Sequence, residues 1–272
     1  MNQKNSIKKA LVFALFILAA GNNVYAQTQT PPQTTPPTPP RWVPEMTEFY
    51  SPEVPLVTAG KPSGNAYMTA PSDATILFDG KDLSKWKGKD GGAAKWDVKD
   101  GTFTVKKGTG DISSVMDFND FQLHIEWLIP ANITGKGQAR GNSGIFLQGI
   151  YEVQVLDNYN NENKTYVNGQ AGSIYKQTAP LRNVVNAPGQ WNSYDIIYTA
   201  PRFKEDSSLF SPAYVTLIHN GVVIQNHTQL KGNTPYIGLP RYRMHGKGPI
   251  KLQDHGDPSE PVSYRNIWIR EL

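Results

Sequence analysis

The chain has 272 residues, a formal net charge of +4 and no cysteine. The lack of cysteine excludes a disulfide framework and a lipid-modified cysteine at a cleavage site. The charge falls to +1 once the three lysines of the N-terminal leader are set aside, so the composition gives no support to a nucleic-acid partner. The remainder is long enough for one substantial hydrophobic core.

The N-terminus has the pattern of a secretory signal peptide. Lys4, Lys8 and Lys9 precede an apolar run at residues 10–20, and Val24-Tyr25-Ala26 supplies a small-residue cleavage pattern. The apolar run is much shorter than the roughly 20 residues that a membrane-spanning helix needs. We therefore expect residues 1–26 to be removed, and the product to be periplasmic or secreted without a membrane span.

Residues 27–71 are rich in Thr, Gln and Pro, a composition that cannot bury a core. We expect an extended tether up to about Pro40. Beyond it we expect an arm in which Trp42, Phe49 and Tyr50 either pack loosely on the following domain or stay disordered. Residues 72–272 are expected to form the single folded domain.

Beyond Ser72, short runs of β-branched and aromatic residues alternate with Gly, Asn, Asp and Pro, which is typical of strands separated by turns. Asn220-Gly221 and Asp100-Gly101 predict hairpins, because a type I′ turn needs positive φ at both central residues. No stretch keeps the apolar period of a helix. About eleven strands predict an all-β fold, either a two-sheet sandwich or a barrel. The expected strands are residues 75–78, 95–98, 102–105, 121–129, 143–147, 151–156, 191–198, 213–218, 222–225, 250–253 and 263–270.

Three of the expected strands carry planar hydrogen-bonding side chains on one face, because side chains alternate across a strand. Gln, His and Glu pair well with sugar hydroxyls, whereas the alternative is a merely solvated face. The three sets share one surface only if their strands are neighbours in one sheet. The sets are Gln122, His124 and Glu126; Glu152 and Gln154, with Asp157 at the strand end; and Lys251, Gln253 and His255.

Loops next to these strands add further candidates. Gly141-Asn142-Ser143-Gly144 allows the backbone to approach a ligand closely, with Asn142 as a substrate-binding candidate and Arg140 as an anchor. An exposed loop arginine is, however, the commoner case. Trp191, Tyr175 and Tyr242 could stack on a pyranose ring, although tryptophans more often belong to the core.

Four blocks of sequence occur in a recognisable order. They are residues 77–83 with Trp86, 142–147, 151–157 and 248–256, and Tyr264-Arg265-Asn266-Ile267 follows near the C-terminus. In this order they resemble the 3-keto-disaccharide hydrolase domain family, formerly a domain of unknown function, from about Ala74 to Glu271. The resemblance implies a concanavalin A-like jelly-roll sandwich, a fold shared with lectins and glucanases, that acts on glycosides oxidised at carbon 3. Two long segments, 158–190 and 201–212, depart from the family pattern and are expected to shape substrate choice.

The implied chemistry assigns roles to these residues. A ketone at carbon 3 acidifies the proton on carbon 2, so a base can remove it, the enolate can expel the glycosidic oxygen, and water can add to the enone. We expect Glu152 to be the base, or otherwise an acceptor for a sugar hydroxyl, and His255 to protonate the leaving group. Lys251 or Arg140 would stabilise the enolate. An alternative Lewis acid is a divalent cation, although no short ligand motif is present; its ligands would be His124, Glu126, Glu152 or His255.

Other functions fit the same residues. A glycosidase would need two carboxylates at a defined separation, which Glu126 and Glu152 could supply. A non-catalytic carbohydrate-binding protein is the main alternative, since the sandwich supports lectins as readily as enzymes, and a structural module without a ligand is the third. A deep pocket where Glu152 and His255 converge would favour catalysis. An apolar groove without a perturbed acid would favour binding.

Overall fold

The computed structural model describes residues 41–56 and 69–272. The expected signal peptide and the tether up to Pro40 lie outside the described residues. Within the described part, helix is limited to short 3-10 turns, and no helix is long and apolar enough to cross a membrane. The 3-10 turns are η1 (Pro44–Thr47), η2 (Gly137–Ala139), η3 (Tyr159–Asn161) and η4 (Val167–Gly169).

The strands form two main sheets and a small ribbon. The larger sheet contains β1 (Thr75–Phe78), β3 (Asp97–Lys99), β4 (Thr102–Thr104), β6 (Phe121–Leu128), β9 (Trp191–Thr199), β12 (Tyr214–His219), β13 (Val222–Gln229) and β15 (Ser263–Glu271). The smaller sheet contains β2 (Trp86–Gly88), β5 (Ile112–Phe118), β7 (Ser143–Leu147), β8 (Tyr151–Val155) and β14 (Gly248–Leu252). The ribbon pairs β10 (Arg202–Phe203) with β11 (Leu209–Ser211).

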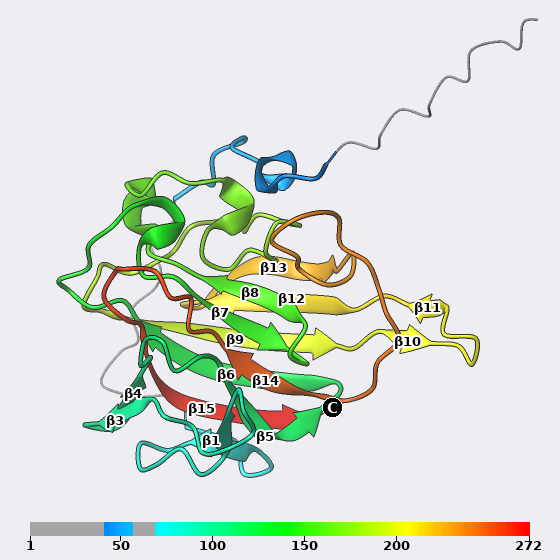
Figure 1. Cartoon of the computed structure of the whole chain (residues 1–272), viewed down its shortest axis with the longest axis horizontal. Helices are drawn as coiled ribbons and strands as arrows, with labels where there is room; N and C mark the ends of the chain where they lie inside the picture. Colours follow the sequence, from blue (N-terminus) through cyan, green and yellow to red (C-terminus); the bar gives the residue numbers. More distant parts are fainter. Residues whose placement is uncertain (1–40, 57–68) are drawn as a thin grey trace, which may run out of the picture. The chain divides into compact units, whose positions relative to one another are not determined.

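The two main sheets are antiparallel and pack face to face as a sandwich (Figure 1). The larger sheet has the order β13-β12-β9-β6-β15-β4-β3, with β1 also pairing with β15, and the smaller has the order β2-β5-β14-β7-β8. The all-β fold predicted from the strand pattern is therefore confirmed, and of the two architectures left open it is the sandwich.

Both predicted hairpins are present. Asn220 and Gly221 join β12 to β13 with φ of 50° and 80°, and Asp100 and Gly101 join β3 to β4 with φ of 51° and 76°. These are the left-handed values that a type I′ turn needs, and Asn, Asp and Gly adopt them at low cost. Strands β2, β5, β10 and β11 were not predicted. In β5 the usual alternation is reversed, because Ser114 is buried while Val115 is exposed.

The core lies between the two main sheets and fixes which way each polar residue points. On β6 the side chains of Phe121, Leu123, Ile125 and Trp127 are fully buried, and on β8 the alternate residues from Tyr151 to Val155 pack into the same core. Burial of each such side chain contributes about 1.5–3 kcal/mol. The polar residues between them must therefore point away from the core, outward from two different sheets.

Residues 41–56 pack against the sandwich, and residues 41–272 form one compact unit. Thr47 and Val54 are the buried side chains of this arm. Trp42, Phe49 and Tyr50, for which the sequence left loose packing and disorder both open, have exposed side chains. The arm is attached mainly through hydrogen bonds of its backbone. The pattern of apolar residues in the sequence does not predict such an attachment.

Candidate functional site on the smaller sheet

Residues of β7, β8 and β14, together with the residue that follows β14, stand in rows across the outer face of the smaller sheet. Lys251 pairs with Phe146, and Phe146 pairs with Glu152, which sets these three in one row. In the next row Gly144 pairs with Gln154, and the Gln253 amide donates to the Gly144 carbonyl at 3.0 Å. Two of the three predicted polar strands, β8 and β14, therefore share one surface. We call this surface the polar face.

Glu152 is the most perturbed acid on the polar face. Its residue is only 5% exposed, and no other described residue makes a hydrogen bond or ion pair with its carboxyl group. Burial raises the pKa of Glu152 to about 8, with the positive charge of Lys251 opposing this shift and the negative charge of Asp111 adding to it. Buried carboxylates are normally paired, so an unpaired one in such a row is typical of a functional site.

A glycine makes room for this carboxyl group. A Cβ atom on Gly144 would collide with Glu152 Oε1 and with the Phe146 ring, so the Glu152 side chain leans across the glycine into the second row. We expected the glycines of residues 141–144 to admit a ligand to the backbone. The space over Gly144 is instead taken by Glu152, and a Cβ on Gly141 would meet the Ile129 side chain.

Lys251 places a positive charge beside Glu152. Its Nζ lies 3.8 Å from the centroid of the Phe146 ring and 3.2 Å from Asp111 Oδ2. A cation held over an aromatic ring and next to a carboxylate has a defined position. Asp111 was missed in the sequence because it comes just before β5, the strand with reversed alternation.

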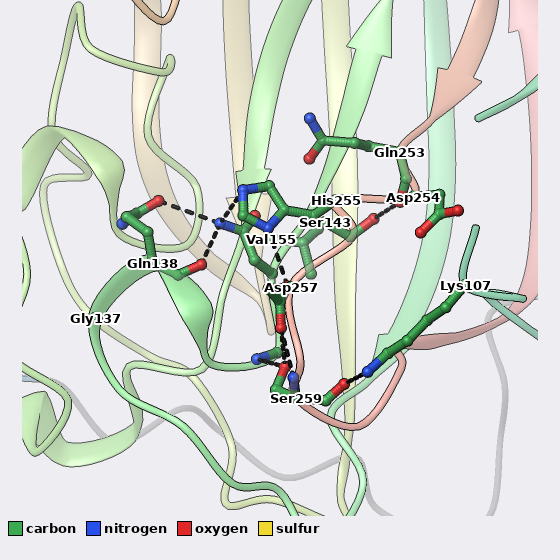
Figure 2. A network of polar contacts seen from close by, with 12 residues as sticks. Lys107, Gly137, Gln138, Ser143, Val155, Gln253, Asp254, His255, Asp257 and Ser259 are labelled. Carbon is green, nitrogen blue, oxygen red and sulfur yellow. Dashed lines mark hydrogen bonds and ion pairs between the residues drawn. The ribbon is translucent and has the colours of Figure 1, made fainter. Parts of the chain in front are cut away.

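His255 lies at the far end of the polar face, within a hydrogen-bonded chain (Figure 2). Its Nδ1 is 3.0 Å from Asp257 Oδ2, and its Nε2 is 3.3 Å from Asn142 Nδ2. Since an amide nitrogen can only donate, His255 Nε2 accepts from Asn142 and Nδ1 donates to Asp257. Burial opposes ionisation of Asp257, but hydrogen bonds from His255 and Ser259 lower its pKa overall.

The chain of hydrogen bonds continues from His255 through Asn142 to Gln154, whose Nε2 donates to Asn142 Oδ1 at 2.9 Å. Gln154 Oε1 and Gln253 Oε1 are buried and have no hydrogen-bond partner in the described part of the chain. Each unsatisfied buried acceptor costs about 1–3 kcal/mol, so a ligand that brings hydroxyl donors would be favoured here. Glu152 and His255 thus share a face but make no direct contact, and the hollow beside His255 measures only about 10 Å³.

Tyrosines flank Glu152 on the side away from His255. The Tyr175 amide donates to the Glu152 carbonyl at 3.1 Å, and the hydroxyls of Tyr175 and Tyr166 lie 2.9 Å apart. Burial and the nearby charge of Glu152 both raise the pKa of Tyr175. Of the three aromatic candidates, Tyr175 alone is placed at Glu152. Trp191 lies under Arg265 on the larger sheet. The Tyr242 hydroxyl accepts from the Ala213 amide, just before β12, and donates to the Leu230 carbonyl, just after β13.

Arg140 and Asp157 form an ion pair. Arg140 Nε donates to Asp157 Oδ2 at 2.7 Å, and Arg140 also donates to the Ile133 carbonyl at 3.2 Å. These contacts tie the loop before β7 to the end of β8. The two residues were expected to bind substrate, but the structure uses them to fix the loop that carries Asn142.

His124 and Glu126 belong to a different surface, because β6 lies in the larger sheet. His124 Nδ1 is 2.7 Å from Asp195 Oδ1, and Glu126 accepts hydrogen bonds from Arg265 and Asn266. Burial lowers the pKa of His124, but its hydrogen bonds and charge interactions with Asp195 and Glu126 outweigh this and raise it to about 9. Burial also opposes ionisation of Glu126, whose partners nevertheless hold its pKa below the ordinary value.

One hypothesis from the sequence is therefore wrong. Glu126 cannot form a carboxylate pair with Glu152 across one glycosidic bond, because the core separates their faces. The four residues considered as ligands of one cation are divided between the same two faces. Among the described residues, no group of three or more His, Cys, Asp or Glu is arranged to hold a metal ion.

Comparison with known proteins agrees with this architecture. Residues 73–270 match the model of the 3-keto-alpha-glucoside-1,2-lyase-like domain. The crystal structure of a candidate glycosyl hydrolase from Parabacteroides distasonis ATCC 8503 is 64% identical, with 84% of this chain and 96% of that chain covered and a TM-score of 0.75. A second from the same organism is 25% identical, with 74% and 94% covered and a TM-score of 0.54. A third is 22% identical, with 73% and 99% covered and a TM-score of 0.53.

Among curated proteins, none matches the chain. The family model nevertheless covers most of the sequence, and it confirms the resemblance drawn from the four sequence blocks. The chain belongs to the 3-keto-alpha-glucoside-1,2-lyase-like domain family.

Proposed function

We propose that this protein cleaves the glycosidic bond of 3-keto-glycosides, including 3-keto-disaccharides, on the polar face of the smaller sheet. The observation that carries the proposal is the Glu152 carboxyl group, which is buried, unpaired, shifted in pKa to about 8 and set in one row with Lys251. Family membership and the relatives described as candidate glycosyl hydrolases support the substrate class.

Glu152 acts as the base in this mechanism. A carboxylate with a pKa of about 8 is a stronger base than an ordinary one, because proton affinity rises with pKa. It takes the proton from carbon 2 of the sugar, and the electron pair of that bond forms an enolate with the carbon 3 ketone. Lys251 supplies positive charge for the enolate oxygen from the same row.

Collapse of the enolate then breaks the glycosidic bond. The carbon 3 ketone re-forms, a double bond forms between carbons 1 and 2, and the glycosidic oxygen leaves with the proton that Glu152 has just taken. This produces an enone and a free alcohol. His255, which the sequence suggested as the acid for the leaving group, is assigned to the following step instead, because its Nε2 is an acceptor. Once water replaces Asn142 as its partner, Nε2 takes a proton from the water that adds to carbon 1. Carbon 2 regains a proton, so that the net reaction is hydrolysis.

Carbohydrate binding without catalysis is the second candidate function. The buried, unpaired oxygens of Gln154 and Gln253 favour it, since they would accept hydrogen bonds from sugar hydroxyls with no chemistry involved. A binding protein needs no base, so the raised pKa of Glu152 is the feature that favours the enzyme.

Export and the finer fold class belong to the same proposal. We propose that residues 1–26 direct the chain out of the cytoplasm and are then removed, which the N-terminal sequence of the mature protein from its native host would test. We also keep the concanavalin A-like jelly roll as the proposed class of the sandwich. Recovery of the chain with the leader uncleaved would contradict the first part.

The test is release of the leaving group from a 3-keto-glucoside and from its unoxidised parent, with and without a chelator. Wild type is compared with Glu152→Gln, and with Glu126→Gln as a matched change of a buried carboxyl group on the other sheet. We expect release from the keto compound alone, reduced by about 100-fold or more in Glu152→Gln and retained in Glu126→Gln. No release from either compound, with saturable binding, would favour the carbohydrate-binding alternative.

A further inference from the structure

The arm at residues 41–56 is held firmly against segment 158–178, which lies next to the polar face (Figure 1). The Phe49 amide donates to Asn168 Oδ1 at 3.0 Å, and Asn168 Nδ2 donates to the Thr47 carbonyl at 3.0 Å. Asn161 Nδ2 donates to the Val54 carbonyl at 2.8 Å. Hydrogen bonds along its length, together with buried side chains, make the arm a fixed part of the domain.

Lys176 joins this arm to two other segments. Its buried Nζ lies 3.1 Å from Glu48 Oε1 and donates to the Pro44 carbonyl at 2.9 Å, both on the arm. It also donates to the Tyr236 carbonyl at 3.0 Å. One ammonium group therefore holds together the arm, segment 158–178 and the segment that follows β13.

Tyrosines surround this ammonium group and continue outward from Glu152. Lys176 Nζ lies 5.3 Å from the centroid of the Tyr166 ring and 4.7 Å from that of Tyr236. Tyr166 contacts Tyr175, which adjoins Glu152, and the edge of its ring faces Tyr50 at 6.2 Å. Tyr175 is buried, whereas Tyr50 and Tyr236 are 66% and 60% exposed.

Tyr50 is linked to the proposed site through Tyr166, and Tyr236 is linked to it through Lys176. Tyr50 is held in place by its hydroxyl, which donates to Glu48 Oε2 at 2.9 Å, and the backbone of Tyr236 is held by Lys176. Their rings stay open to solvent, and an aromatic face packs well against the C–H face of a pyranose or against another aromatic ring. Rings that are already positioned lose little conformational freedom when a ligand binds.

We propose that Tyr50 and Tyr236 form an outer subsite that binds the ring of the leaving group, so that the arm determines which 3-keto-glycosides are cleaved. The inference rests on the proposed function and deepens it. The substrate class is a 3-keto-glycoside with a cyclic leaving group, either a second hexose or an aryl alcohol. A methyl leaving group cannot reach this subsite.

The test is the ratio of kcat/KM for a 3-keto-disaccharide to kcat/KM for methyl 3-keto-glucoside, with an aryl 3-keto-glucoside as a third substrate. Tyr50→Ala and Tyr236→Ala are expected to lower this ratio by about 5- to 10-fold. Tyr50→Phe keeps the ring but removes its hydrogen bond to Glu48, and it is expected to lower the ratio less than Tyr50→Ala does. Phe210→Ala, a change of a 71% exposed aromatic residue on β11, is the control. The aryl compound shows whether the subsite takes a sugar, an aromatic ring or both.

A ratio that stays at the wild-type value in both alanine variants would overturn the inference, while cleavage by the wild type would leave the proposed function standing. If the wild type cleaves none of the compounds, the proposed function fails. The same ratio is then measured from the Kd of the disaccharide and of the methyl glucoside. A ratio of binding constants that both alanine variants leave unchanged would overturn the outer subsite as well.

Discussion

Glu152→Gln should make the stability of the folded protein less sensitive to pH. The pKa of Glu152 is about 8 in the folded protein, against an ordinary value of 4.5, so the folded protein holds this proton roughly 3,000-fold more tightly. The contribution of this group to stability is complete below pH 4.5 and is lost as the pH rises through 8. At about 1.4 kcal/mol for each tenfold difference in proton affinity, the whole loss amounts to about 5 kcal/mol.

Urea unfolding of wild type and variant at pH 5, 7 and 9 measures this effect. Glutamine does not titrate, so the free energy of unfolding of Glu152→Gln relative to wild type should rise by about 3–4 kcal/mol between pH 5 and pH 9. Any constant cost of burying the amide drops out of this difference. Glu260→Gln is the control, because the pKa of Glu260 is lowered by its hydrogen bonds and its contribution changes only at acid pH. A flat difference for Glu152→Gln would mean that the carboxyl group is ionised in the folded protein, and would refute the reasoning.

Two further changes test the site and the arm. Gly144→Ala should displace the Glu152 carboxyl group and lower kcat/KM for a 3-keto-glucoside by about 10-fold or more. Gly246→Ala is the control, because a Cβ atom there would meet open space and should leave kcat/KM unchanged. Equal activity in both variants would contradict the proposed geometry. Glu48→Ala leaves a buried ammonium group without its carboxylate and should lower the free energy of unfolding by about 3 kcal/mol. Glu53→Ala removes an exposed ion pair and should lower the free energy of unfolding by less than about 1 kcal/mol. Thermal or urea unfolding measures both losses, and similar losses in Glu48→Ala and Glu53→Ala would refute the assigned role of the arm.

Local signals in the sequence were enough to predict most of the strands. The hairpin at Asn220-Gly221 and the alternation in β6, β8 and β14 depend on neighbouring residues alone, and the structure has them where they were expected. Strand β5 was not predicted, because the polar residue Ser114 is buried in it. The Ser114 hydroxyl donates to the Met116 carbonyl and accepts from the amide of Ile250, which is distant in sequence. A polar residue satisfied in this way looks like a turn residue when the sequence is read alone.

The candidate site was predicted only in part, for a related reason. Alternation shows that Glu126 and Glu152 each point away from the core, but it does not say which sheet a strand joins. Neighbouring strands in the sheet decide that, and they come from distant parts of the chain. The pairing of Lys176 with Glu48 spans 128 residues and carries no local signal. Glu152 was selected from the sequence as the candidate base because of its place in the strand, its family block and its polar neighbour Gln154.

The central claim is that cleavage begins with removal of the proton on carbon 2, and the isotope content of the product tests it most directly. The protein is incubated with a 3-keto-glucoside in D₂O, and the released 3-keto sugar or enone is analysed by mass spectrometry and NMR. Authentic 3-keto-glucose under the same conditions controls for spontaneous exchange. Elimination and hydration predict an enone, or a sugar with deuterium at carbon 2, and neither should form with Glu152→Gln. A released sugar that keeps its original hydrogen at carbon 2 would show direct hydrolysis and contradict the mechanism.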